Sequence, residues 1–415
     1  MSPFEIVAIL TTLAAAFAYV NYRFIRLPMT IGLMVIALVS SIGLVALGRA
    51  GLVPLGTFFD FVTSIDFDAA LLNGMLGALL FAGALHIKTH DLAEQAWTIG
   101  IFATVGVLVS TAVVGVGFWA VFRWLGFPID MGYALLFGAL ISPTDPIAVG
   151  AILRKAGVPK SLEVKISGES LFNDGFGVVI FLLLLELVTS GEPATAGHVG
   201  ELFLEEVVGG LLYGLVIGWV CYRLLKSVDN YQLEILITLA LVTGGYALAH
   251  RLHTSGPLAM VVAGLLVGNK GRALAMSDMT RERLDQFWEL VDEFLNAALF
   301  VLIGVEVVVI EFNGPVLEAA AIMIPLVLVA RWISIAMPVG AMSRFRRFTP
   351  HAVKILTWSG LRGGISVALA LSLPAGPYRD LVLTATYVVV CFSIIVQGLS
   401  IGPITERLLR ARTEG

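Results

Sequence analysis

Charged side chains are scarce in this 415-residue chain. Asp, Glu, Lys and Arg make up 13% of the residues, whereas hydrophobic residues make up 58%. A soluble domain of ordinary composition is about 45–50% apolar and about 25% charged. The mean hydropathy is +0.94, and no soluble fold of this length buries so many apolar side chains. Most of the chain is therefore expected to lie in a lipid bilayer.

Cysteine and histidine are also few, and their positions argue against a disulfide-stabilised fold, a metal site and a histidine-dependent enzyme. Cys221 and Cys391 lie in separate apolar stretches without a metal-ligand pattern, so we expect neither a structural disulfide nor a cofactor. All six histidines lie at the ends of apolar stretches or between them. An intramembrane enzyme built on Ser170 and a histidine base is therefore disfavoured. The net charge of −4 gives no reason to expect a nucleic acid partner.

Apolar stretches long enough to span a membrane are abundant. A spanning helix needs about 20 apolar residues, and we place about thirteen in an all-α membrane protein, with a weaker stretch at 52–66 expected at the membrane interface. The predicted spans are 4–21, 28–47, 67–85, 96–122, 131–153, 164–188, 203–225, 231–249, 256–268, 286–310, 315–342, 353–374 and 380–403.

The 26 Lys and Arg are distributed unevenly between the two sides of this arrangement. Connections on one side contain basic clusters at 154–165, 270–283 and 344–354, whereas the other side carries isolated arginines such as Arg49 and Arg251. The basic side is expected to be cytoplasmic, so the N-terminus is predicted outside and the C-terminus in the cytoplasm. No connection is long enough to fold alone, and we expect a single membrane domain without a soluble one.

Two of the predicted spans contain residues that interrupt a helix. In the fifth, Asp145 stands between Pro143 and Pro146, and each proline removes a backbone donor and disfavours helix in the residue before it. In the twelfth, Arg362 lies within a glycine cluster at 360–364. Two interrupted helices in corresponding halves of a chain predict a transport site between inverted repeats.

The sixth predicted span carries the polar residues that best fit such a site. Ser170 and Asp174 are four residues apart and share one helix face. Together with the freed backbone carbonyls around Thr144, they would supply the oxygen ligands that a dehydrated monovalent cation requires. Asp145, at the N-terminal end of a half-helix, would offset the positive helix dipole there. An ionisable residue inside a span is costly and is by default a candidate for function, so Asp174 is predicted to carry the cation and the proton.

The remaining intramembrane polar residues are expected to stabilise the site. Glu169 lies on the neighbouring face of the same span, together with Asn173, and we predict that it pairs with Arg362. Arg331, in the eleventh span, is a further stabilising candidate.

Three long motifs resemble the Na+/H+ antiporters of the NhaP and NHE branch. They are GALISPTDPIAVGAIL, GESLFNDGFGVVIF and WSGLRGGISVALALSLP. The resemblance covers the whole chain. It implies a homodimer in which a core bundle, approximately 96–188 and 315–403, moves against the remaining dimerisation and scaffold helices, with the fifth and twelfth spans crossing at the site.

Carried over residue by residue, the resemblance implies that Asp174 binds Na+ and H+ in turn. Ser170, Asp145 and the backbone at Thr144 would assist it. Asn173 is informative, because relatives with Asn followed by Asp are typically electroneutral and exchange one Na+ for one H+. The Glu169–Arg362 pair would stabilise the site.

Two departures from the family pattern qualify this expectation. Many relatives carry an acidic residue in the third span where this chain has Ala82, so cation affinity or pH response is expected to differ. The long cytoplasmic tail of animal relatives is absent, which favours the inner membrane of a prokaryote. K+/H+ exchange by the same fold stays open, and a cation channel is disfavoured because no filter-like repeat is present.

Overall fold

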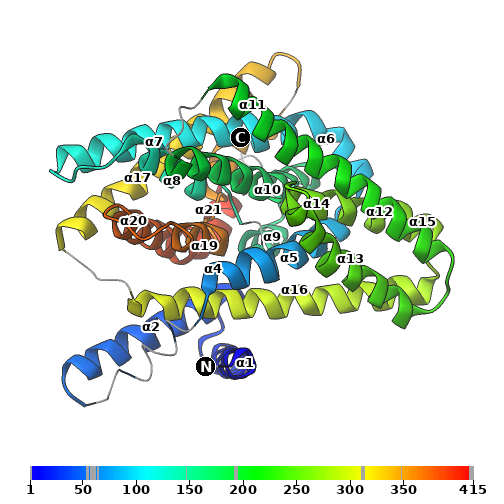
Figure 1. The fold of residues 1–415 in the computed structure, drawn as a ribbon, viewed down its shortest axis with the longest axis horizontal. Coiled ribbons are helices and arrows are strands. Elements are labelled where there is room, and N and C mark those ends of the chain that lie inside the picture. Colours follow the sequence, from blue (N-terminus) through cyan, green and yellow to red (C-terminus); the bar gives the residue numbers. More distant parts are fainter. Residues whose placement is uncertain are drawn as a thin grey trace.

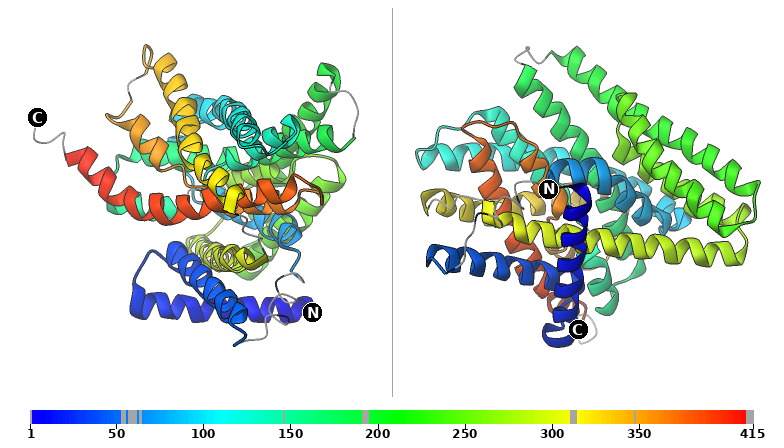
Figure 2. Two further views of the ribbon diagram at one scale, coloured as in Figure 1. Left: turned by 90° about the vertical axis from the view of Figure 1, so that its left-hand side faces the viewer. Right: turned by 60° about the horizontal axis from the view of Figure 1, so that its bottom comes forward.

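The computed structural model describes residues 2–52, 56, 62, 65–145, 147–190, 195–309, 314–346 and 348–410. All regular structure in these residues is helical, as Figures 1 and 2 show. The predicted all-α class is therefore confirmed for the described chain. Most of the stretch 52–66 lies outside it.

The helices of the first half run from the N-terminus to a long helix that carries the central acidic motif. They are α1 (Pro3–Val20), α2 (Met29–Arg49), α4 (Phe67–Ala69), α5 (Leu76–Leu85), α6 (Thr89–Ile101), α7 (Val107–Trp124), α8 (Met131–Ile141), α9 (Ile147–Lys155) and α10 (Lys160–Ser190).

The helices of the second half include two more long ones, α16 and α17. They are α11 (Ala196–Phe203), α12 (Gly210–Lys226), α13 (Tyr231–Arg251), α14 (Gly256–Leu266), α15 (Arg272–Leu274), α16 (Asp278–Glu306), α17 (Gly314–Met342), α18 (Ala352–Trp358), α19 (Gly364–Leu371), α20 (Arg379–Phe392) and α21 (Gly398–Arg410). Short π-helical turns extend several helices, at Asn21–Ile25, Ala70–Met75, Phe102–Gly106, Leu204–Gly209, Val267–Gly271 and Ser393–Gln397.

Within the described residues, nine helices are long and apolar enough to cross a membrane. The four other predicted spans are helical as well, but each differs in one respect. The fifth and twelfth are interrupted, the ninth is the short helix α14, and the tenth is α16, which carries many charged residues. The total of thirteen spans therefore stays a prediction.

Local sequence accounts for where individual helices begin and end. The side chain of Ser2 accepts a hydrogen bond from the backbone N–H of Glu5 before α1, and Asp130 accepts one from Gly132 at 2.7 Å before α8. Gly126 and Gly157 follow α7 and α9 with φ of 86° and 72°. Glycine is favoured there because this left-handed conformation is costly for other residues.

The helices form two groups. In the first, α7 packs on α8 and α17, α10 packs on α6 and α8, and α17 packs on α20. In the second, α16 packs on α2 and α5, and α14 packs on α5 and α12. Figure 1 shows α16 running across the molecule with α1 and α2 on its outer side. Helices α10 and α19 contact both groups, so residues on them lie where the groups meet.

Small residues allow close approach of the helix backbones. A Cβ atom at Gly264 of α14 would come within 2.8 Å of the Phe81 carbonyl oxygen of α5. Such contacts stabilise membrane helices because lipid supplies no hydrophobic drive for helix association.

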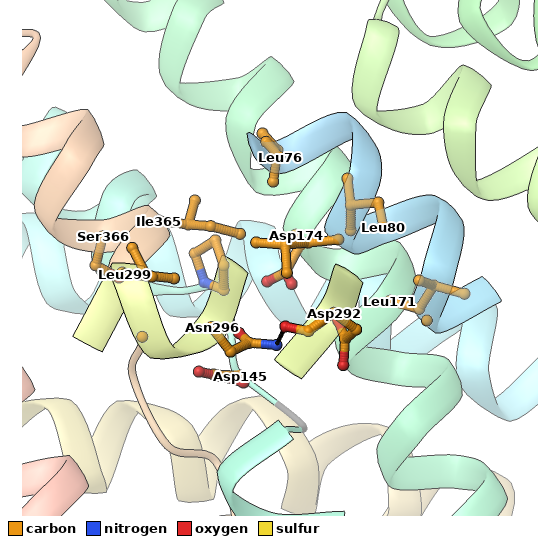
Figure 3. A pocket seen from close by; sticks show the side chains of 15 residues that line it. Leu76, Leu80, Asp145, Leu171, Asp174, Asp292, Asn296, Leu299, Ile365 and Ser366 are labelled. Atoms are coloured by element: carbon orange, nitrogen blue, oxygen red, sulfur yellow. Dashed lines mark hydrogen bonds between the residues drawn. The ribbon is translucent and has the colours of Figure 1, made fainter. Parts of the chain in front are cut away.

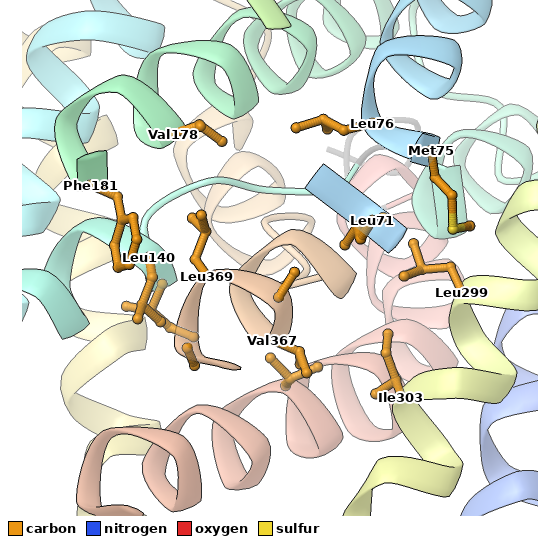
Figure 4. Close-up of a cluster of buried hydrophobic side chains, with 14 of the residues drawn as sticks. Leu71, Met75, Leu76, Leu140, Val178, Phe181, Leu299, Ile303, Val367 and Leu369 are labelled. Atoms are coloured by element: carbon orange, nitrogen blue, oxygen red, sulfur yellow. The ribbon is translucent and has the colours of Figure 1, made fainter. Parts of the chain in front are cut away.

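Buried apolar side chains fill the space around α19, and we refer to them as the apolar cluster (Figure 4). All are less than 10% exposed. The cluster includes Leu71, Met75, Leu76, Leu140, Val178, Phe181, Leu299, Ile303, Val367 and Leu369.

Candidate functional site

The fifth predicted span is interrupted at the position that Pro143 and Pro146 indicated in the sequence. Helix α8 ends at Ile141 and α9 begins at Ile147, with extended or irregular backbone between them. Pro146 itself lies outside the described residues. Ser142, the first residue of the break, donates its hydroxyl to the Gly138 carbonyl oxygen at 2.6 Å, and its Oγ lies 2.8 Å from Ser110 Oγ, within hydrogen-bond distance. These bonds anchor the end of α8 against α7.

The twelfth span is interrupted as well, and the two interruptions contact each other. Helix α18 ends at Trp358 and α19 begins at Gly364. The backbone N–H of Asp145 donates to the Leu361 carbonyl oxygen at 2.8 Å. A backbone donor freed by one break is therefore paired with a carbonyl freed by the other. Unpaired backbone groups at this depth are tolerated only where they find partners inside the protein.

Arg362 joins the two breaks a second time through its side chain. Its guanidinium donates to the carbonyl oxygens of Ser142 and Pro143, the latter at 2.9 Å, and its backbone N–H donates to Ser393 Oγ at 2.9 Å. The side chain is fully buried. A cation at this position stabilises the negative C-terminal end of α8.

The predicted pair between Glu169 and Arg362 is wrong. Glu169 instead receives two hydrogen bonds from Arg331 of α17, one from each terminal nitrogen, the second at 3.0 Å. Arg331 Nη2 also donates to the Leu356 carbonyl at 3.3 Å. Both side chains of this pair are buried, Glu169 almost completely. Sequence spacing within one helix cannot show which of two buried arginines faces a given glutamate, because that depends on how α10 packs against α17.

Three of the predicted site residues form one hydrogen-bonded cluster. Thr144 Oγ1 lies 3.0 Å from Ser170 Oγ and accepts a bond from Asn173 Nδ2 at 2.9 Å. The backbone N–H of Thr144 donates to Asn173 Oδ1 at 3.3 Å. All three residues are buried. The cluster fixes the break of the fifth span against the middle of α10. It joins Ser170 to Asn173, which the helical spacing had placed on neighbouring faces.

Asp174 and Asp145 line a cavity of about 90 Å³ beside this cluster (Figure 3). Asp174 is 7% exposed. Gly363 lies against the Asp145 carboxylate, and a Cβ atom there would come within 2.6 Å of its Oδ2. Thr144 and Ser170 do not line the cavity, since their hydroxyls face each other. Among the residues that the structure describes, no Lys, Arg or His lines the cavity.

Two further polar residues of this cavity come from α16 and were missed by the sequence analysis. Asp292 and Asn296 line it from a helix that lies across from Asp174 (Figure 3). Glu306, later on the same helix, is buried as well. All three fall inside the tenth predicted span, so the rule that an intramembrane ionisable residue is functional would have found the two acids.

A larger cavity of about 540 Å³ adjoins the first. Gly83, Leu171 and Asp292 line both of them. Its other lining residues include Lys88, Arg154 and Lys160, which belong to the basic connections. Ala82, where many relatives were expected to have an acid, also lines this cavity.

No three acidic, histidine or cysteine side chains are grouped closely enough to hold one metal ion, as far as the described residues extend. Asp145, Asp174 and Asp292 therefore line one space without converging on one point. Any ion in the cavity would also need hydroxyl, amide or backbone oxygens as ligands.

Comparison with known proteins gives consistent results for sequence and fold. Residues 9–407 match the family model described as sodium/hydrogen exchanger, transmembrane. The chain is 49% identical to the Na+/H+ antiporter NhaP of Pseudomonas aeruginosa, over 97% of this chain and 96% of that protein. It is 37% identical to the Na+/H+ antiporter NhaH of Halobacillus dabanensis, over 89% and 91% of the two chains.

Among solved structures, the sodium proton antiporter MjNhaP1 of Methanocaldococcus jannaschii at pH 8 is similar, with a TM-score of 0.77. The match covers 99% of this chain and 100% of that chain at 18% identity. At this identity the likeness shows the fold.

Proposed function

Since the chain belongs to the sodium/hydrogen exchanger family, we propose that it exchanges Na+ for H+ at one buried site centred on Asp174. The observation that carries this proposal is a buried carboxylate in a small cavity, next to two interrupted helices in mutual contact. Within the described part of the chain, no basic residue lines that cavity. Family membership makes it a secondary transporter of the membrane and not an enzyme.

Exchange follows from competition for one carboxylate. A bare charge is costly inside a membrane protein, so Asp174 is occupied by either a cation or a proton when the site is closed off. Binding of Na+ displaces H+, and binding of H+ displaces Na+. The direction of transport is set only by the Na+ and H+ gradients across the membrane.

The proposed ligands of Na+ are Asp174 and Asp145 in the cavity wall, with Thr144 and Ser170 directly behind them. The two hydroxyls are held 3.0 Å apart and can each turn an oxygen lone pair toward a cation without moving the backbone. Together they would give Na+ the several oxygen ligands that a hard cation requires.

The other polar residues are proposed to hold this geometry. Asn173 fixes Thr144, and Arg362 binds the carbonyls at the end of α8. The Glu169–Arg331 pair braces α10 against α17. Because relatives with Asn followed by Asp at these positions are typically electroneutral, we propose that this chain, with Asn173 and Asp174, exchanges one Na+ for one H+.

Alternating access is proposed from the arrangement of cavities. The site adjoins the cavity of about 540 Å³ on the basic side. A separate cavity of about 330 Å³, lined by His250 and His253 at the end of α13, approaches from the other side and reaches Val178. Val178 belongs to the apolar cluster, as does Leu76, which lines the cavity of Asp174. Opening of the apolar cluster would expose Asp174 to the opposite side.

The larger architecture is proposed on the same basis. The core bundle of approximately 96–188 and 315–403 would move against the other helices, which would form a homodimer in the inner membrane of a prokaryote. Thirteen spans, a cytoplasmic C-terminus, inverted repeats and crossing of the fifth and twelfth spans complete this proposal. The contact of Asp145 with Leu361 supports the crossing.

The experiment is transport by purified protein in proteoliposomes that contain a pH-sensitive dye. Na+ is expected to dissipate an imposed pH gradient, and Asp174→Asn is expected to abolish this response. Glu186→Gln is the matched control, since it removes a carboxylate from an exposed part of the same helix. Normal exchange by the Asp174 variant would contradict the assignment.

The same assay tests the finer parts of the proposal. Parallel runs with Li+ and K+ separate Na+/H+ from K+/H+ exchange. An imposed membrane potential is expected to leave the rate unchanged, and a strong dependence on the potential would contradict one-for-one exchange.

A further inference from the structure

Asp292 and Asn296 stand out because the proposed mechanism does not use them. They are four residues apart on α16 and share one helix face. Asn296 Nδ2 donates to the Asp292 carbonyl oxygen at 2.8 Å, which orients the amide. Its Oδ1 is buried and has no hydrogen-bond partner in the part of the chain that the structure describes. A buried acceptor without a donor is costly unless something else binds there.

The position of Asp292 is as informative as its chemistry. It lines both the cavity that contains Asp174 and the larger cavity toward the basic side. Gly83 and Leu171 also line both, so Asp292 is the charged residue at the junction. A cation that moves from the larger cavity to Asp174 must pass its carboxylate.

Four of the charged residues that line the larger cavity form two ion pairs. Arg154 lies 3.2 Å from Glu163, and Lys160 lies 2.6 Å from Asp91. Paired charges of opposite sign produce little net field. Lys88 and Glu289, which are of opposite sign, also line this cavity. Asp292 is the charged residue that lines both cavities, so its carboxylate lies directly at the junction.

We propose that Asp292 and Asn296 form a vestibule site that binds the cation on its way from the basic side to Asp174. The site takes a hard monovalent cation, with the Asp292 carboxylate and the Asn296 amide oxygen as ligands and water completing the shell. It is distinguished from the Asp174 site by position, because Asp292 also lines the larger cavity, whereas Asp174 does not. The vestibule site rests on the proposed Na+/H+ exchange, and it describes how the cation reaches Asp174 from the basic side.

A vestibule site acts on one side of the membrane only, and this gives a sharp test. Na+ dependence of exchange is measured in inside-out and right-side-out membrane vesicles. Asp292→Asn is expected to raise the KM for Na+ by roughly tenfold when Na+ is on the basic, cytoplasmic side, which corresponds to about 1.4 kcal/mol. The KM for Na+ from the opposite side and the maximal rate are expected to change little.

The matched control is Glu293→Gln, which removes the same charge from the next residue of α16. Glu293 is exposed and lines neither cavity, so its KM is expected to stay at the wild-type value. Asn296→Ala is expected to raise the cytoplasmic KM in the same one-sided manner, because it removes the amide oxygen. Asp292→Glu is expected to recover part of the affinity, since it restores the charge.

Several outcomes would overturn the vestibule site. An unchanged KM in Asp292→Asn would show that the carboxylate does not attract the cation. An equal increase from both sides would indicate a structural role at Asp174 instead. An unaltered Asn296→Ala would show that the amide oxygen is satisfied by water alone. Failure of the proposed exchange itself is distinct, because the wild-type protein would then show no Na+-dependent response at all.

Discussion

The buried pair of Glu169 and Arg331 permits a direct test of how the core helices are held together. The two side chains are 1% and 7% exposed and contact each other through both carboxylate oxygens. Arg331→Met leaves the Glu169 charge buried without its partner, and Glu169→Gln leaves Arg331 in the same state. Either change alone is expected to destabilise the protein.

The magnitude follows from the burial of the pair. Removing one partner of a buried ion pair costs about 3–5 kcal/mol, because the remaining charge is left without compensation. Removing both charges eliminates that penalty, and replacement of a buried pair by neutral side chains is often close to neutral. The double variant Glu169→Gln/Arg331→Met is therefore expected to be more stable than either single variant. The interaction energy between contacting positions is typically about 0.5–3 kcal/mol.

The assay is thermal unfolding of the detergent-solubilised protein, with all variants heated at one scan rate because unfolding of large proteins is often irreversible. Arg362→Met serves as the comparison, since Arg362 contacts the Ser142 and Pro143 carbonyls and not Glu169. Its effect is expected to add to that of Glu169→Gln. Recovery of stability with Arg362→Met, and additivity with Arg331→Met, would refute the pairing described above.

Two further predictions concern the transport site. Gly363→Ala places a Cβ atom within 2.6 Å of the Asp145 carboxylate, so it is expected to lower the exchange rate at least several-fold while protein yield is maintained. The control is Gly376→Ala, because the nearest atom to a Cβ there is 3.9 Å away. Equal exchange rates of the two variants would contradict a close contact at Asp145. Lowering the pH on one side of the membrane is expected to raise the apparent KM for Na+ on that side without changing the maximal rate, because H+ and Na+ compete for Asp174. Initial exchange rates at several pH values measure this effect. A fall in the maximal rate at constant KM would contradict competition at one carboxylate.

Much of the candidate site could be predicted from the sequence because local rules determined it. Proline at 143 and glycine at 363 and 364 interrupt a helix wherever that helix packs, and both interruptions are present. The four-residue spacing of Ser170 and Asp174 placed them on one face of α10 by helix geometry alone. Charge scarcity likewise determined that the chain spans a membrane.

The partners of these residues could not be predicted in the same way. Glu169 faces Arg331 and not Arg362 because α17 packs beside the middle of α10, whereas the break around Arg362 faces the break at Ser142. Asp292 was overlooked because the first turns of its helix carry many charged residues, so its carboxylate resembled those of a helix end exposed to water.

The sequence by itself determined the membrane class, the two interrupted helices and a central carboxylate at Asp174, because each depends on composition or on neighbours within a few residues. The tertiary structure decided which buried charges meet and which helix completes the cavity. It joined Asp145 to Leu361, which are distant in the sequence, and brought Asp292 to the junction of two cavities. Contacts of this kind depend on the packing of whole helices, and no periodicity along the chain encodes them.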